Sequence, residues 1–205
     1  MKGKIVLLLL VCIVAISAAQ AQRSSQDSLH RKFFIGSTFF LLGNFDTKNP
    51  PGFAQLNFGY RINAKNTVSI ELKTWKYAWP LGIPYGQSQL APEEKFPGHI
   101  RENGFALAYQ HFWYNGLYTG IHVMNAWQSF VNTDGKKIDN GFQIFNTYRL
   151  GYQIPLFKNR FFIEPSLAVT HRPYHTEMPQ AFKVLDDKWS KFFFAEPGLH
   201  FGVNF

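Results

Sequence analysis

The last fourteen residues of the chain alternate between apolar side chains and small or polar ones, with a strict period of two. The apolar set is Phe193, Ala195, Pro197, Leu199, Phe201, Val203 and Phe205, and the intervening set is Glu196, Gly198, His200, Gly202 and Asn204. Because successive side chains of a β-strand point to opposite faces, this alternation predicts a strand with one apolar face and one polar face. The chain therefore ends on a strand whose two faces need different surroundings.

Alternation of the same kind recurs in seven earlier segments. We predict eight strands, at residues 31–42, 53–62, 67–79, 104–113, 117–131, 142–156, 161–174 and 192–205. Short turns separate them at residues 63–66, 114–116 and 157–160, and long loops at residues 43–52, 80–103, 132–141 and 175–191. An even number of strands about ten residues long, with short turns at one end and long loops at the other, is typical of outer-membrane barrels. Both chain ends would then lie at the short-turn end.

Two of these strands share a local repeat that contains a Glu-Pro pair. Glu164 precedes Pro165 in the first, and Glu196 precedes Pro197 in the second. Proline cannot donate a backbone hydrogen bond to a sheet, so within sheets it is found at edges, bulges and bends. We expect local bends at both pairs, with each glutamate pointing inward and each proline outward.

The first 21 residues have the pattern of a secretory signal peptide: a basic start, an apolar run of about a dozen residues and an Ala-x-Ala sequence that ends at Ala21. The apolar run is shorter than the ~20 residues that a spanning helix needs. Cys12 is the only cysteine and lies inside this leader, so the mature chain has no disulfide framework. We predict a signal peptide at residues 1–21, a short polar segment at 22–30 and one β-barrel domain at 31–205.

The composition leaves two classes of β-protein. Aromatic residues make up 18% of the chain and charged residues 17%, below the ~25% that is usual in soluble domains. The formal charge of +8 falls to +6 when Lys2 and Lys4 leave with the signal peptide. The remaining excess of cations is dispersed near the chain start and the short turns, which does not indicate a nucleic-acid-binding module. A soluble β-protein and a membrane barrel remain.

The strand faces favour the membrane barrel over a soluble, lipocalin-like barrel, which would place the apolar faces inside. The apolar faces hold more large side chains than a narrow eight-stranded interior can contain, whereas the polar faces are rich in small residues. Aromatic residues also gather near both ends of the strands: Trp75, Trp79, Trp127 and Trp189 toward the long loops, and Tyr60, Trp113, Tyr152 and Phe205 toward the short turns. Two aromatic girdles are typical of membrane barrels. The predicted fold is an all-β, eight-stranded, antiparallel, transmembrane up-and-down β-barrel with both termini in the periplasm.

With its C-terminal phenylalanine, this pattern resembles the small eight-stranded bacterial outer-membrane proteins of the OmpA-transmembrane-domain and OmpX type. The resemblance implies residence in the cell outer membrane of a Gram-negative bacterium, contact with outer-membrane lipid, and delivery by periplasmic chaperones. It also implies that Phe201, Val203 and Phe205 form the signal read by the barrel-assembly machinery. This group contains adhesins, structural anchors, host-factor binders and a few lipid A-modifying enzymes, so the fold alone does not choose a function.

Nine charged or histidine side chains fall on the inward face of the predicted strands: Arg61, Glu71, Lys73, His122, Arg149, Glu164, Arg172, Glu196 and His200. A functional interpretation is a polar track or gate. The alternative is a plug in which opposite charges satisfy one another, because eight strands leave room for little besides side chains. Four cations face three anions, which favours the plug.

A second candidate site lies at the outer end of the seventh strand, where His171, His175 and Glu177 could form a catalytic or metal site. In a strand, histidines four residues apart share a face but lie nearly two pleats apart. The lipid A deacylases of the outer membrane carry a histidine and a serine two residues apart on a strand, and no His-x-Ser occurs in this chain. We therefore expect interfacial side chains at a loop root, with no metal site and no cofactor.

The leading functional hypothesis is a non-enzymatic outer-membrane barrel with a plugged lumen and a structural or surface-binding role. Loops 80–103 and 175–191 are the longest, and they carry the apolar residues Ile83, Tyr85, Phe96, Phe182 and Trp189. Such loops are expected to bind an extracellular ligand or to fold over the barrel mouth. The alternatives are a lipid A acyl hydrolase or acyltransferase and a small diffusion channel.

Overall fold

A computed structural model describes residues 31–47, 50–82 and 95–205. The predicted signal peptide and the polar segment at 22–30 lie outside these residues. The elements are β1 (Phe33–Thr38), the 3-10 helix η1 (Phe39–Phe45), β2 (Ala54–Arg61), β3 (Asn66–Tyr77), the 3-10 helix η2 (Pro80–Gly82), β4 (His99–Tyr114), β5 (Leu117–Val131), β6 (Lys137–Tyr152), β7 (Ile154–Leu156), β8 (Phe161–His175), α2 (Gln180–Asp186) and β9 (Phe192–Asn204). None of the helices in the described part of the chain has the length and hydropathy to cross a membrane.

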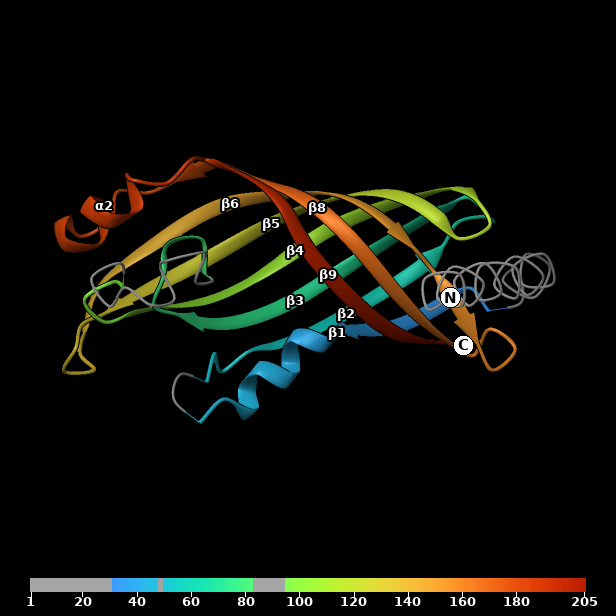
Figure 1. The fold of residues 1–205 in the computed structure, drawn as a ribbon, viewed down its shortest axis with the longest axis horizontal. Coiled ribbons are helices and arrows are strands. Elements are labelled where there is room, and N and C mark those ends of the chain that lie inside the picture. Colours follow the sequence, from blue (N-terminus) through green and yellow to red (C-terminus); the bar gives the residue numbers. More distant parts are fainter. Residues whose placement is uncertain (1–30, 48–49, 83–94) are drawn as a thin grey trace, which may run out of the picture.

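All strands are antiparallel and belong to one sheet, which closes into a ring of eight strands (Figure 1). Strands β6 and β7 count as one, because only Gln153 separates them and both pair with β8. Each strand pairs with its neighbours in sequence, and β9 pairs with β1 to complete the ring. The prediction of an all-β chain with eight antiparallel strands is confirmed.

The two ends of the ring differ in their connections. The end with the short turns, which we call the turn end, also holds the last residue: the Phe33 N–H donates to the Phe205 carbonyl at 3.1 Å, and the Phe205 N–H donates back at 2.9 Å. Asn115 and Gly116, the two turn residues between β4 and β5, both have positive φ, at 44° and 93°, as a tight hairpin turn requires. Helix α2 and the longer connections lie at the opposite end, the loop end (Figure 1).

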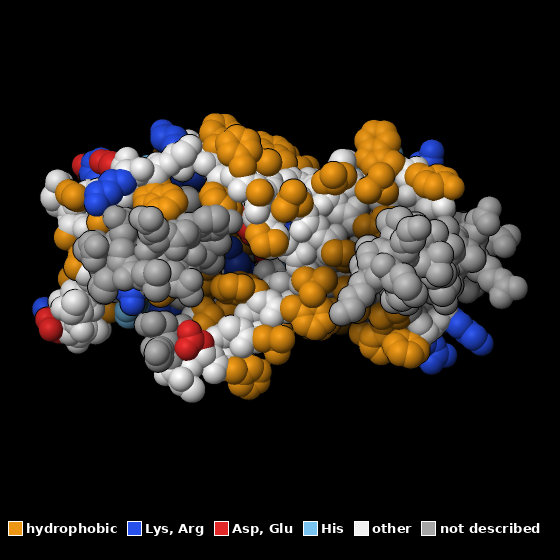
Figure 2. Space-filling view, viewed as in Figure 1, with side chains coloured by type: hydrophobic (Ala, Val, Ile, Leu, Met, Phe, Trp, Pro, Cys, Tyr) orange, Lys and Arg blue, Asp and Glu red, His pale blue; other side chains and the backbone are white. Residues whose placement is uncertain are grey.

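The polarity of the ring is opposite to that of a protein with an apolar core. Apolar side chains point outward, and many are half exposed, such as Leu107 at 60% and Leu167 at 52%. Charged and polar side chains point inward and are buried, including Glu71, Glu164 and Thr67. Figure 2 shows the resulting surface, on which apolar side chains cover much of the middle of the molecule. The interior is therefore polar and must be stabilised by hydrogen bonds and ion pairs.

The first predicted strand, at 31–42, is wrong in its second half. Strand β1 ends at Thr38, and the next residues form η1. The Thr38 hydroxyl accepts a hydrogen bond from the Phe40 N–H at 3.3 Å, which starts the helix, and donates to the Leu199 carbonyl at 3.1 Å. Phe39, which continued the alternation, packs on Phe201 of β9 at 4.9 Å, and the next residue, Phe40, packs on Phe53 at 4.8 Å.

Of the two bends expected beside the Glu-Pro pairs, only the one beside Pro197 is accompanied by a change of register. At the other pair, Glu164 lies opposite Gln153, where the strand is interrupted between β6 and β7, but the register is the same on both sides, since Gly151 pairs with Ser166 and Ile154 pairs with Ile163. Close to Pro197, the pairing of β8 with β9 shifts its register between Ala168 and Thr170, and Ala195 has a φ of 65°. Both prolines are exposed.

Candidate functional site

The interior of the ring is the candidate site, and it is filled most completely at the turn end. Arg61 donates to the Asn204 side chain at 2.7 Å, and Asn204 donates to the Asn159 carbonyl at 2.8 Å. The guanidinium of Arg61 also lies 5.3 Å from the ring centre of Phe34 and 6.0 Å from that of Phe162. This arrangement buries a cation by means of amide acceptors and aromatic faces.

The next layer contains Glu164, which was also predicted to point inward. The Gln153 side chain donates a hydrogen bond to the Glu164 carboxylate at 2.6 Å. Glu164 as a whole residue is buried, with 6% of its surface exposed. Arg149 extends from β6 and donates to the Ser166 hydroxyl at 2.8 Å. The fully buried side chain of Tyr118 lies at the same level and, with Arg149 and Glu164, lines a small cavity of about 20 Å³. Together with the Arg61 layer, these residues close the turn end of the interior.

Around the middle of the ring, ionisable side chains from different strands meet. The Nδ1 atom of His122 lies 3.5 Å from the Glu71 carboxylate, and Lys73 lies 3.5 Å from Glu102. Glu102 is also held by Gln143, which donates to it at 2.6 Å. Glu71 and Lys73, which were both predicted to point inward, thus each lie 3.5 Å from an ionisable side chain of another strand.

A cavity of about 350 Å³ occupies the interior next to this layer. Six of the nine predicted interior residues line it: Glu71, Lys73, His122, Arg149, Glu196 and His200. The rest of the lining is mixed: it has the apolar residues Phe39, Phe40, Phe53, Trp75, Met124, Phe145, Phe193, Pro197 and Leu199, and the polar residues Thr38, Gln55, Thr147 and Thr170 with Gly198. The structure thus brings most of the predicted residues together, but around a space and not in a continuous plug.

Arg172 belongs to a separate layer at the loop end. Its guanidinium forms two hydrogen bonds with the Asp186 carboxylate, at 2.8 and 2.5 Å. Asp186 is the last residue of α2, and both side chains are buried. Two parallel bonds between guanidinium and carboxylate give a strong and directional link, so they tie α2 to β8.

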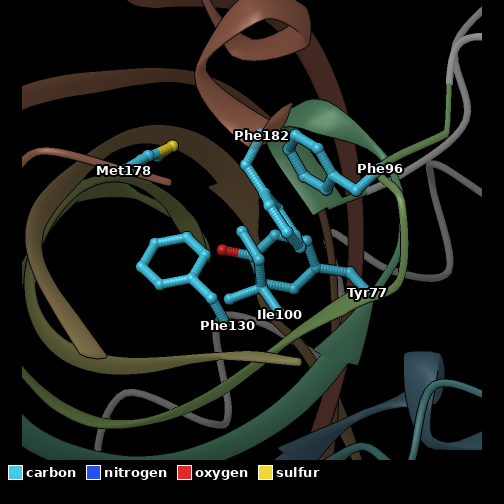
Figure 3. Close-up of a cluster of buried hydrophobic side chains, with 6 residues drawn as sticks. All are labelled: Tyr77, Phe96, Ile100, Phe130, Met178 and Phe182. Atoms are coloured by element: carbon cyan, nitrogen blue, oxygen red, sulfur yellow. The ribbon is translucent and has the colours of Figure 1, made fainter. Parts of the chain in front are cut away.

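Above this ion pair, apolar side chains form a cluster that we call the outer plug (Figure 3). Its members are Tyr77, Phe96, Ile100, Phe130, Met178 and Phe182. The ring of Phe182, from α2, lies 5.0 Å from that of Phe96 and 5.3 Å from that of Phe130. Phe96 and Phe182, from the two longest predicted loops, are thus buried against side chains of the strands at the loop end of the ring. Trp189 is partly buried, and Ile83 and Tyr85 lie outside the described residues.

Sequence reasoning missed two residues of this network. Glu102 was assigned to a loop, although it shares the parity of the polar face that continues through Gly104 and Ala106, so the alternation could have revealed it. Asp186 gives no such signal, because its position depends on how α2 folds back into the ring.

The structure does not bring His171, His175 and Glu177 into one site. The His171 ring stacks on Phe192 at 4.1 Å with an interplanar angle of 3°, and His175 Nδ1 lies 2.9 Å from the Thr176 carbonyl oxygen. Glu177 is exposed. Over the ranges that the structure describes, no group of three or more His, Cys, Asp or Glu residues is placed to hold a metal ion.

The residues of the predicted assembly signal lie on β9 and at its end. Val203 and Phe205 are exposed on the outer surface, and the Phe205 ring stacks on Phe33 at 6.2 Å. Phe201 is half-buried and packs on Phe39 of η1 at 4.9 Å. Comparisons of the chain with protein-family models, with curated proteins and with solved structures found no match. Its function therefore has to be inferred from the geometry of the ring.

Proposed function

We propose that this chain is a non-enzymatic integral outer-membrane protein, in which the ring of strands is a transmembrane β-barrel with a plugged lumen. The observation that carries the proposal is the apolar outer surface around a polar interior. Burying one large aliphatic or aromatic side chain contributes roughly 1.5–3 kcal/mol. Side chains such as Leu56, Leu72, Leu107 and Leu150 are 40–60% exposed on the outside of the ring. Lipid around the ring would remove many such side chains from water, and each one would add to the stability of the protein.

Closure of the ring supports a membrane location for a second reason. In hydrocarbon, each unsatisfied backbone N–H or C=O group costs several kcal/mol, so spanning sheets have to be closed. Exposed aromatic side chains are also found toward both ends of the strands, for example Trp113 and Phe205 at the turn end and Trp127 and Tyr174 at the loop end. Such belts fit the two interfaces of a bilayer.

The orientation follows from the predicted leader and from the connections. In outer-membrane barrels the short turns face the periplasm and the long loops face outward. The turn end would then be periplasmic, together with Phe205. Helix α2 and the outer plug would lie on the extracellular side. Loops 80–103 and 175–191 are the segments that we propose for a structural or ligand-binding role there.

A plugged lumen is supported at both ends by different contacts. The Arg61 and Glu164 layers fill the turn end, and the outer plug with the Arg172–Asp186 pair fills the loop end. A lipid A acyl hydrolase or acyltransferase would need an acid-base histidine beside a nucleophile. Both candidate histidines contact other groups instead, since His171 stacks on Phe192 and His175 contacts a carbonyl.

Heat-modifiability tests the proposal. The mature chain, extracted from outer membranes in mild detergent, is run on a denaturing gel with and without boiling, alongside a sample from the soluble periplasmic fraction. We expect an unboiled band that migrates differently from the boiled band, found only in the membrane fraction. A single band in the periplasmic fraction would contradict the proposal. Loss of an acyl chain from lipid A that depends on His171 or His175 would favour the acyl hydrolase. Conductance in planar bilayers would favour the diffusion channel.

A further inference from the structure

The outer surface of the ring carries an apolar groove of about 420 Å³ near the turn end. Two rows of side chains border it, and each row follows the direct pairing of neighbouring strands: Phe33, Tyr60 and Val68 form one row, and Phe58, Ile70 and Leu107 form the other. Gly59 and Ser69 pair with each other between the rows and also line the groove. Each of the six bordering residues is 37–60% exposed, so the groove belongs to the outside of the ring.

One end of the groove reaches the rim of the ring at the last residue. Phe205 lines the groove together with Phe33, on whose ring it stacks. The turn between β7 and β8 lies beside this end, because the Asn204 N–H donates to the Arg160 carbonyl at 2.7 Å. Arg31 reaches the same turn and donates to the Lys158 carbonyl at 2.6 Å. The groove therefore ends beside a group of cations, which we call the basic rim: Arg31, Lys32, Lys158 and Arg160.

The basic rim has few anions near it. The segments that form the turn end, residues 31–33, 60–66, 111–117 and 153–161, contain no Asp or Glu. The carboxylate of Phe205 is an anion at the same place, against four cations. Lys32, Lys158 and Arg160 are exposed, and Figure 2 shows basic side chains beside apolar ones at this end of the molecule. At the loop end, by contrast, the exposed Lys183 pairs with Asp187.

An apolar groove that ends at a group of cations fits an amphiphile with a hydrocarbon chain and an anionic head. The groove has a volume near the lower end of the roughly 300–1,000 Å³ of ligand pockets, which suits one acyl chain. Clusters of Lys and Arg at a membrane surface attract anionic lipid headgroups. A zwitterionic head would bring an ammonium group to the same cations and would lose part of this attraction.

We propose that the groove and the basic rim bind one anionic glycerophospholipid, such as phosphatidylglycerol, from the periplasmic leaflet. One acyl chain would lie in the groove, and the phosphate would lie among the cations of the basic rim. The inference rests on the proposed membrane location and orientation, because the rim meets a lipid leaflet only in that case. A second copy of the chain suits the groove less well, since a two-fold symmetric contact would bring two basic rims together.

Native mass spectrometry of the full mature protein in mild detergent tests the preference for an anionic head. The protein is incubated with equal amounts of phosphatidylglycerol and phosphatidylethanolamine that have the same acyl chains. We expect one bound phosphatidylglycerol per chain, at about fivefold higher occupancy than phosphatidylethanolamine, because only the former has a net negative charge. Equal occupancy would overturn the proposal. A dimer without bound lipid would overturn it in favour of a second copy.

A pair of double variants tests the basic rim. Lys158→Gln with Arg160→Gln removes two exposed cations beside the groove and should abolish the fivefold preference. Lys136→Gln with Lys137→Gln removes the same charge from exposed residues at the loop end and should leave the preference unchanged. Equal loss in both double variants would show that net charge, and not the basic rim, selects the lipid, which would overturn the proposal.

Photolabelling tests the groove. Phosphatidylglycerol with a photoreactive diazirine in one acyl chain is added to the protein in lipid nanodiscs, and labelled peptides are mapped by mass spectrometry. We expect labelling of residues 58–60 and 68–70 at least threefold above that of residues 148–150, on the outer surface of β6. Val68→Trp should reduce this labelling at least threefold, because Val68 lines the groove. Val123→Trp is the matched control: Val123 is 36% exposed on β5, outside the groove, and its variant should label normally. Even labelling of the outer surface would contradict a defined site.

Heat-modifiability separates this site from the membrane proposal. Variants are compared when they have the native gel shift, and the rim variants and the groove variant test the site independently of each other. A native shift without a preference for phosphatidylglycerol overturns the lipid site alone. Absence of the shift in the unmodified protein overturns the membrane proposal and the lipid site with it.

Discussion

At the turn end the ring is closed by side chains of its own strands and turns, whereas at the loop end the segment between β8 and β9 packs Met178 and Phe182 against strand residues and Phe96. Glycines at the turn end leave room for inward rings: a Cβ atom on Gly59 would lie 1.8 Å from the Phe34 ring, and one on Gly151 would lie 2.4 Å from Tyr118. At the loop end, Phe182 and Asp186 are delivered by α2. We therefore expect the turn-end closure to be lost only with the sheet itself, and the loop-end closure to be separable from it.

The largest expected effect comes from Asp186→Ala, which removes one partner of a buried ion pair. Loss of one partner leaves the Arg172 charge buried and unpaired, which costs roughly 3–5 kcal/mol. We expect this cost to weaken the packing of α2 against the ring, while the strands of the ring stay folded. Hydrogen exchange of residues 180–186 measures it. Asp187→Ala is the matched control, because Asp187 pairs with the exposed Lys183, and it should not change the exchange. Equal exchange in both variants would mean that the ion pair does not hold α2.

Phe182→Ala tests the apolar part of the same closure. Phe182 is fully buried, and removal of a buried phenylalanine side chain costs about 3 kcal/mol. Val184→Ala, at a residue that is 54% exposed on α2, is the control and should change little. Protease cleavage within 175–191 should increase only for Phe182→Ala. Planar bilayers should stay silent for both variants, because the turn end remains filled; conductance after Phe182→Ala would show that the loop end alone blocks the lumen.

Gly59→Ala tests the other closure. The added Cβ collides with Phe34, and such overpacking costs about 1–3 kcal/mol. Here we expect the whole ring to be destabilised, seen as a lower urea midpoint for loss of the heat-modifiable form. Gly120→Ala is the control, since its Cβ would meet its nearest neighbours at 3.3 and 3.4 Å. A change confined to α2 exchange would contradict the assignment of Gly59 to the turn-end closure.

The smallest effect on stability is expected for Phe205→Ser. Phe205 is 56% exposed and touches the ring mainly through Phe33, so the folded protein should lose less than about 1 kcal/mol in detergent. The amount assembled in cells should nevertheless fall several-fold if the terminal residue is the assembly signal. Phe157→Ser, at a 75% exposed turn residue, is the control. Normal assembly of Phe205→Ser would remove that role.

Much of the fold could be predicted from local alternation. A period of two assigns each side chain of a strand to one face whatever its neighbours are, because the pleat of a single strand sets it. Arg61, Glu71, Glu164 and Arg172 are buried inside the ring as predicted. The hairpin at Asn115 could also be predicted, since few residues accept the positive φ of that turn.

The sequence by itself thus determined which faces are polar, how many strands form and how they are connected. Only the tertiary structure decided which charges meet, where β1 stops and what closes the loop end. Arg172 pairs with Asp186 because α2 folds back into the ring. Strand β1 ends at Thr38, whose hydroxyl donates a hydrogen bond to the carbonyl of Leu199, a residue close to the C-terminus. The physical reason is that a strand's alternation is local, whereas partners across the ring depend on the register of all eight strands.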